Sequence, residues 1–489
     1  MNSWNVVYSL CLLVGLCALL STTAMVVVVD KTYNSSTQTV NSVAQTCIQL
    51  LTIFAAPVFG KLSDKIGRNL PLAITAGLMP GTLVVLSFYE QLPILILITL
   101  NVICVGIGQS HICVIQAYIV DNSLPDDKLK NLGIMYATIA FSFLLGAGVG
   151  GVIESKFPVR GITFESWNVE EEAFTNNETL RAHTMLLRYI GLCLIVFAVV
   201  VSSLLPKGTM QKTEIEKMKD KEDRSFNFFS SITYIATARS EIKLMALLNA
   251  LRVGAFTPST VSFVTYMVRR FGKISPVFHV FLGVSSIMGI ISSLSIKRLS
   301  RNISSKNMIV LGFVFLALQN IGYGIIQKSF YVAFFIPASF MFFGIVTNIM
   351  LDGVASSLVS SEEQGVLMGA MSQFRSFASF LLTIPCGLLF TYAAELDMAY
   401  RKSHNVDDVY FRGFPFLVFS IFGIFGACVV WFSFNSIDMN IKSPHKENEA
   451  GYYTKLDDGN DVEIADYEDE TLDMAILVGS RSSSFVEMT

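Results

Sequence analysis

Long apolar segments alternate with short polar ones along almost the whole chain. Twelve of these segments approach the length of about 20 mostly apolar residues that an α-helix needs to cross the hydrocarbon core of a bilayer. In the first half they lie near residues 6–29, 40–60, 70–89, 92–121, 131–153 and 185–205. In the second half they lie near residues 242–268, 276–296, 307–327, 330–358, 366–394 and 411–435. The pattern predicts an all-α membrane protein with twelve transmembrane helices.

The order of the apolar segments predicts two six-helix halves. The spacing of Leu62, Ser63 and Lys65 in the first half recurs in the second half at Leu294, Ser295 and Lys297. Parallel six-helix repeats are the architecture of many secondary carriers, whose substrate site lies between the repeats. We expect a first half at 1–206, a charged cytoplasmic linker at 207–241, a second half at 242–436 and a disordered acidic cytoplasmic tail at 437–489.

Composition agrees with a membrane protein and excludes other classes. Hydrophobic residues make up 52% of the chain and charged residues only 15%, against about 25% charged residues in soluble domains. The eight cysteines form no CxxC pair, and no GxxxxGK[ST] phosphate loop is present. We therefore expect no metal site, no cofactor, no enzyme activity and no ATP-driven pump.

Charge and sequence motifs predict the topology. With both termini in the cytoplasm, most Lys and Arg residues of the loops lie inside, as the positive-inside rule requires. The glycosylation triplets at Asn34 and Asn177 then lie outside. Tyr453 and Leu456 in the tail have the Y-x-x-Φ form of an adaptor-read sorting signal, although a solvated tail without a signal is the alternative. The expected location is the plasma membrane or an endolysosomal membrane.

The segment "GKLSDKIGR" resembles the loop between helices 2 and 3 of the major facilitator superfamily. It contains Gly60, Asp64, Gly67 and Arg68 at the spacing of that motif, directly after the second apolar segment. The resemblance implies a latch that closes the inner gate: Asp64 faces the start of helix 11, and Arg68 pairs with Asp121 at the end of helix 4. The alternative is a positively charged loop that serves only the topology.

A second resemblance lies in the fifth apolar segment. Gly146, Gly150 and Gly151 match the helix 5 pattern of the drug-antiporter, tetracycline-carrier-like branch, with Ala147 in place of its proline. The proton-coupled folate transporter family has a similar outline. Small residues there allow close helix packing, and ordinary packing is the alternative reading. The helix 4 segment lacks the arginine to which the family often assigns proton transfer, so that role is not carried over.

Ionisable and amide side chains at membrane depth are the candidates for binding substrate or protons. Arg252 and Arg375 lie inside predicted helices of the second half and present forks of donors for a carboxylate or phosphate. A structural ion pair is the alternative. His111 and Gln116 lie together on the fourth segment, where a histidine bound to a neighbouring helix is the alternative to a titrating one.

One further pair of polar residues lies on the tenth apolar segment. Asn348 and Asp352 are four residues apart and share a helix face. Asp352 lies near the inner end of this segment, so it is a candidate gate residue as well as a candidate ligand.

These features predict a secondary transporter that moves a small organic solute by alternating access. A small-molecule substrate, anionic if the arginines bind it, a coupling proton, the lipid bilayer and an adaptor for the tail are the expected partners. No nucleic acid is expected, and the expected state is a monomer. A uniporter and a non-transporting receptor or scaffold with the same fold are the alternatives.

Overall fold

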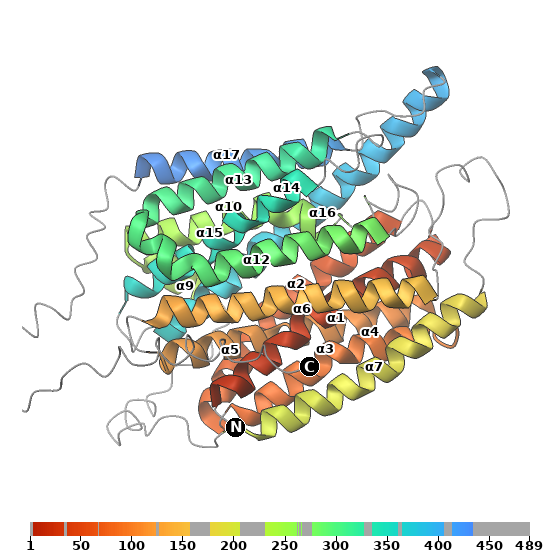
Figure 1. Ribbon diagram of the computed structural model, residues 1–489, viewed down its shortest axis with the longest axis horizontal. Coiled ribbons are helices and arrows are strands. Elements are labelled where there is room, and N and C mark those ends of the chain that lie inside the picture. The colour runs from red at the N-terminus through yellow and green to blue at the C-terminus, as the bar shows by residue number, and fades with distance from the viewer. Residues whose placement is uncertain are drawn as a thin grey trace, which may run out of the picture. The chain divides into compact units, whose positions relative to one another are not determined.

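The computed structural model describes the helical part of the chain (Figure 1). Every described residue belongs to one compact unit, Met1–Met439. The described residues are 3–33, 37–66, 68–123, 127–156, 177–205, 230–261, 263, 266, 276–326, 335–359, 364–404 and 413–433, without the side chains of some residues near helix ends.

The first half contains seven helices among the described residues. They are α1 (Ser3–Tyr33), α2 (Thr37–Ile66), α3 (Asn69–Leu86), α4 (Ile94–Gly108), α5 (Ser110–Asp121), α6 (Lys128–Lys156) and α7 (Asn177–Ser203). The fourth apolar segment is predicted as one helix, but the structure divides it at Gln109 into α4 and α5. The residue at the break, Gln109, is polar. Its backbone N–H donates to Val105 O at 2.8 Å, as in a continuous helix.

The second half contains eight helices among the described residues. They are α9 (Ser230–Thr237), α10 (Ser240–Val261), α12 (Pro276–Asn302), α13 (Ser305–Ile325), α14 (Phe335–Ser339), α15 (Met341–Ser357), α16 (Gln364–His404) and α17 (Phe414–Ser433). The described part of the predicted helix 330–358 is likewise divided, at Phe340, into α14 and α15.

Eleven helical segments of the described chain are long and apolar enough to cross a membrane. The α4 and α5 helices share one of these spans, and α14 and α15 share another. The remaining predicted span corresponds to α10, which carries Arg252 and Asn249 in its interior and is not among the eleven. The described residues are helical without a strand, so the all-α membrane fold is confirmed.

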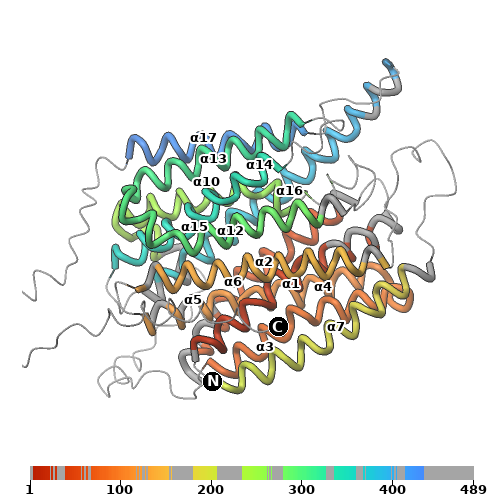
Figure 2. Tube along the Cα trace, viewed as in Figure 1, coloured from red at the N-terminus to blue at the C-terminus, as the bar shows by residue number. Residues whose placement is uncertain are grey.

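Two helix pairs join the halves along their length. The α2 helix packs against α16, and α6 packs against α12. Figure 2 shows α6 and α12 running side by side, one from each half. We name the end of the bundle at which α7 ends and α10 begins the linker end, because the predicted linker connects these two helices. In the predicted topology it is the cytoplasmic end.

Each half has its own apolar core. One core cluster gathers side chains of α1, α3, α5, α6 and α7, and another gathers side chains of α9, α10, α12, α13, α15, α16 and α17. Tyr136 of α6 packs against both clusters. Its ring therefore lies where the two halves meet.

The close approach of α6 and α12 depends on Gly133. A Cβ atom at this position would lie 2.6 Å from the backbone oxygen of Ser293 on α12. Gly133→Ala should lower stability by about 1–3 kcal/mol, because overpacking forces the two halves apart. Thermal unfolding of the purified protein measures this loss.

The control for Gly133→Ala lies on the same helix. Gly148 has nothing within 4 Å of an added Cβ, so Gly148→Ala should be neutral or slightly stabilising, since alanine favours the helix more than glycine does. Equal unfolding temperatures for the two variants would contradict the close contact at Gly133.

Candidate functional site

Five side chains form a polar group between the two halves, which we name the charge cluster. Its members are Gln116 of α5, Tyr136 of α6, Arg252 of α10, Asp352 of α15 and Arg375 of α16. Arg375 Nη1 donates to both carboxylate oxygens of Asp352, at 3.1 and 3.2 Å. Tyr136 OH donates to Asp352 Oδ2 at 2.9 Å, and Gln116 Nε2 donates to Tyr136 OH at 3.0 Å.

The carboxylate of Asp352 is the centre of this cluster. Asp352 is 1% exposed, so it is withdrawn from water almost completely. Burial of an unpaired carboxylate is costly, and the guanidinium of Arg375 together with the hydroxyl of Tyr136 replaces the lost water. Both oxygens of Asp352 are thereby hydrogen-bonded.

Arg252 gives the cluster an excess of positive charge. Its charge interacts with Arg375, Asp352 and Tyr136, and its Nε atom is buried without a hydrogen-bond partner among the described atoms. The cluster thus holds two guanidinium groups and one carboxylate. Because arginine stays protonated in proteins, the cluster keeps a formal excess of one positive charge.

One hydrogen bond of the cluster, from Tyr136 OH to Asp352 Oδ2, crosses from one half to the other. Gln116 and Tyr136 belong to the first half, whereas Asp352 and Arg375 belong to the second. Near them, Cys113 of α5 and Ser372 of α16 form another contact between the halves, with Sγ and Oγ 3.0 Å apart. The cluster is therefore part of the interface between the halves.

Four of the six predicted substrate or proton candidates meet in the cluster: Gln116, Arg252, Asp352 and Arg375. Tyr136 completes it and is absent from the sequence-based prediction. A tyrosine in the middle of an apolar helix was the available signal, because a buried phenol hydroxyl usually has a hydrogen-bond partner.

The other two candidates lie elsewhere. His111 is fully buried, and its Nδ1 lies 2.6 Å from Gly108 O, the last residue of α4. The imidazole thus binds the backbone at the break between α4 and α5. Asn348 lies one turn before Asp352 on α15, and its buried Oδ1 has no partner among the described atoms.

The predicted latch is described only at Arg68. This side chain is buried, donates from Nη1 to Val114 O at 3.2 Å and lies with its guanidinium 5.8 Å from the ring centre of Tyr118. Gly67 and the side chains of Asp64 and Asp121 lie outside the described residues, as do the surroundings of Gly60. The pairing of Arg68 with Asp121 therefore stays a prediction.

A second charged contact joins the halves at the linker end. Lys297 Nζ of α12 lies 3.2 Å from Asp127 Oδ1, directly before α6. The side chains are 42% and 38% exposed, so this pair adds little stability compared with a buried one.

The glycines of the predicted helix 5 motif face two different neighbours. A Cβ on Gly146 would lie 3.2 Å from Gly15 O on α1, and a Cβ on Gly150 would lie 3.0 Å from the His279 ring on α12. Gly151 also faces His279, at 3.4 Å. These contacts fit helix packing, both within the first half and across the interface.

The remaining predicted sites lie beyond the described residues. Asn34, Tyr453 and Leu456 belong to undescribed segments, and the side chain of Asn177, the first residue of α7, is also undescribed. Glycosylation and sorting at these positions stay predictions.

Comparison with known proteins identifies the family. The model of the Major Facilitator Superfamily matches residues 7–383. Hippocampus abundant transcript-like protein 1 of Mus musculus is 24% identical over 429 residues, covering 85% of this chain and 76% of the relative. The Homo sapiens protein of the same name is also 24% identical, with the same shares covered.

Solved structures agree in fold. The human organic anion transporter MFSD10 (TETRAN) superposes with a TM-score of 0.59 at 11% identity, over 88% of this chain and 100% of that one. A D-xylose-proton symporter superposes with a TM-score of 0.64 at 12% identity, over 88% of this chain and 96% of that one. The match of the family model over most of the chain and these folds lead to one conclusion: the protein is a membrane protein of the Major Facilitator Superfamily.

Proposed function

We propose that the protein is a secondary carrier that moves a small organic solute across a membrane by alternating access. Rocking of the first half against the second would open the solute site to one side and then to the other. The observation that carries this proposal is the hydrogen-bond chain from Gln116 through Tyr136 to Asp352, because it crosses the interface inside the bundle.

The polar contacts of this interface favour a protein that alternates between an open and a closed interface over one that stays closed. A permanently closed interface gains no more from a buried ion pair than from well-packed apolar side chains. A hydrogen bond across the interface can break and be replaced by water when the interface opens, at a net cost of about 1.5–3 kcal/mol for a bond to a charged group such as Asp352. Such small differences keep both states populated.

The excess positive charge favours a solute with an anionic group. Asp352 pairs with Arg375, so a carboxylate or phosphate brought beside Arg252 would balance the cluster. The human protein MFSD10 (TETRAN), which has the same fold, is an organic anion transporter. This likeness agrees with an anionic substrate class.

Arg252→Gln and Arg375→Gln should have opposite effects on stability. Loss of Arg252 removes an unbalanced buried charge and should raise the unfolding temperature by a few degrees. Loss of Arg375 breaks both contacts with Asp352 and should lower the unfolding temperature. Arg252→Gln should nevertheless abolish uptake of anionic solutes. Stability losses of equal size in both variants would mean that Arg252 is an ordinary structural residue.

Transport in proteoliposomes tests the proposed function directly. A screen of organic solutes, without ATP and with the pH fixed on each side, should reveal saturable uptake. Strict dependence on ATP would exclude a secondary carrier. Uptake that is unchanged when the proton gradient collapses would favour a uniporter, and a protein held in a single state would favour a scaffold.

The latch belongs to the same proposal. Asp64, Arg68 and Asp121 would hold the linker end closed while the carrier faces the opposite side. The burial of Arg68 beside Val114 and Tyr118 supports this, because both residues belong to α5, which ends at Asp121.

A further inference from the structure

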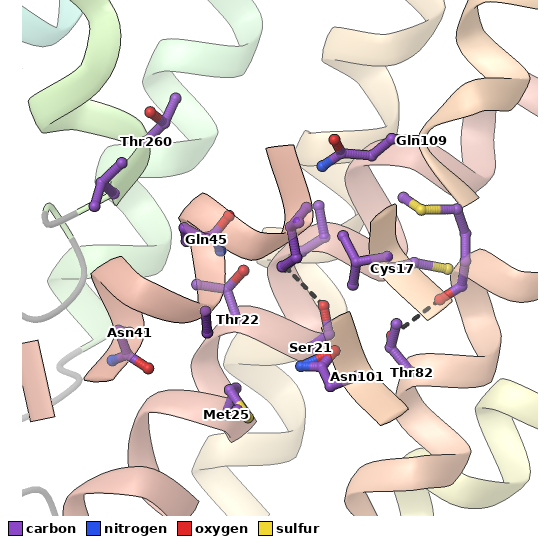
Figure 3. A pocket seen from close by; sticks show the side chains of 16 residues that line it. Cys17, Ser21, Thr22, Met25, Asn41, Gln45, Thr82, Asn101, Gln109 and Thr260 are labelled. Carbon is purple, nitrogen blue, oxygen red and sulfur yellow. Dashed lines mark hydrogen bonds between the residues drawn. The ribbon is translucent and has the colours of Figure 1, made fainter. Parts of the chain in front are cut away.

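A second polar site lies on the far side of the charge cluster from the linker end. Side chains of α1, α2, α3, α4 and α10 and of Gln109 surround a pocket that is partly open to solvent. Thr260 of α10 contributes to its wall, so both halves line it. Figure 3 shows Thr22 of α1 between Asn41 of α2 and Asn101 of α4.

Two amides of this pocket lack partners. Asn41 is 8% exposed and Asn101 is 6% exposed. Asn41 Nδ2 and Asn101 Oδ1 have no hydrogen-bond partner among the described atoms. One is a donor and the other an acceptor. Buried amide atoms are normally hydrogen-bonded, so these two require a partner that the described residues do not provide.

Hydroxyl groups add acceptors to the pocket. Ser21 Oγ donates to Ala18 O at 3.2 Å, and Thr82 Oγ1 donates to Met79 O at 2.9 Å. Because each hydroxyl uses its proton within its own helix, its lone pairs remain able to accept from a ligand.

The pocket lining has no carboxylate, ammonium, guanidinium or imidazole group among the described residues. Apolar side chains such as Met25, Ile48 and Val105 make up the rest of the wall. A concave apolar wall with a few converging polar groups is the usual form of a site for a small molecule. Nothing in this described wall would balance a charge on the ligand.

We propose that this pocket binds the uncharged portion of the transported solute, and that this portion carries hydroxyl or amide groups. Such groups donate and accept at once, so they satisfy both Asn41 Nδ2 and Asn101 Oδ1. The inference rests on the proposed carrier function, in which the anionic group of the same solute faces Arg252. The pocket therefore selects for hydrogen-bonding groups, and the charge cluster selects for charge.

Equilibrium binding to the purified full-length protein tests this assignment. The probes are radiolabelled D-xylose, which is uncharged, D-glucuronate, which adds a carboxylate to a similar ring, and benzoate, which has a carboxylate but no hydroxyl group. D-xylose and D-glucuronate should bind saturably. Asn101→Leu and Asn41→Leu should each weaken both by about tenfold, the usual effect of losing a ligand hydrogen bond in a buried site.

Matched variants separate the pocket from general effects. Asn249 of α10 is fully buried with an unpartnered Oδ1 but does not line the pocket, so Asn249→Leu should change xylose binding less than twofold. If the asparagine variants fail to fold, Gln45→Leu takes their place as a test. It changes a half-buried amide of the pocket wall and should also weaken binding. Arg252→Gln should weaken glucuronate and benzoate binding but not xylose binding.

The outcomes separate this inference from the carrier function. No saturable binding of xylose or glucuronate to the unmodified protein would overturn the inference. Equal xylose affinities in Asn101→Leu, Asn41→Leu and Asn249→Leu would overturn it as well. Xylose and glucuronate binding that depends on Asn101, without uptake of either one into proteoliposomes, would support the pocket and contradict the carrier function.

Discussion

Asp352→Asn should cause the largest loss of stability of any single change in the charge cluster. Without this carboxylate, the positive charges of Arg252 and Arg375 would repel each other with no acid among the described members of the cluster to balance them. Breaking a buried ion pair by removing one partner costs about 3–5 kcal/mol. Thermal unfolding in detergent, and the fraction of protein that remains monodisperse, should both report this loss.

Two variants test the cause of the loss. Asp352→Asn combined with Arg375→Gln should recover part of the stability, because it removes one of the two positive charges. Asp127→Asn removes the acid of the exposed pair with Lys297 and should cost less than about 1 kcal/mol. An Asp352→Asn variant as stable as Asp127→Asn would show that the ion pair is not needed for the fold.

Tyr136→Phe should shift the protein toward the state that is open at the linker end. The change keeps the ring that packs against both cores and removes the hydrogen bond to Asp352 Oδ2. Hydrogen bonds to charged groups contribute about 1.5–3 kcal/mol, so the ratio of the two states should change by at least about tenfold. Accessibility of a cysteine introduced at Gln116 to a membrane-impermeant thiol reagent measures the opening.

Tyr323 provides the control for this experiment. It is buried, and its hydroxyl accepts from Gln319 Nε2 at 3.0 Å within α13 of the second half. Tyr323→Phe should lower stability without changing the accessibility at the linker end. If both tyrosine variants change accessibility alike, the bond between Tyr136 and Asp352 does not hold the two halves together.

The sequence predicted the helices well because their apolar length is a local property. It did not predict the break at Gln109, because the chain stays apolar on both sides of it; the contact of His111 with Gly108 O at this break is visible only in the structure. Helix boundaries also moved by several residues where helices continue beyond the apolar segment, as in α16, which extends to His404.

Charge made part of the candidate site predictable. Arg252, Asp352 and Arg375 stand out because ionisable residues are costly at membrane depth. Which of them pair depends on helix packing, so the bond between Arg375 and Asp352 required the structure. Tyr136 and the amides Asn41 and Asn101 were missed, because a neutral polar residue in an apolar helix gives no signal that separates ligand binding from helix packing.

Distance measurements between spin labels test alternating access most directly. The exposed native cysteines Cys47, Cys193 and Cys428 are first replaced by serine. One label pair, Asn122→Cys with Asn302→Cys, lies at the linker end, and the other, Gln91→Cys with Ser403→Cys, lies at the opposite end, all at exposed positions.

Alternating access predicts two distances at each end, with opposite changes in their populations. In Tyr136→Phe the longer distance should gain population at the linker end, while the shorter distance gains population at the opposite end. A single distance at both ends, unchanged in Tyr136→Phe, would contradict alternating access and leave a protein with the facilitator fold that does not rock.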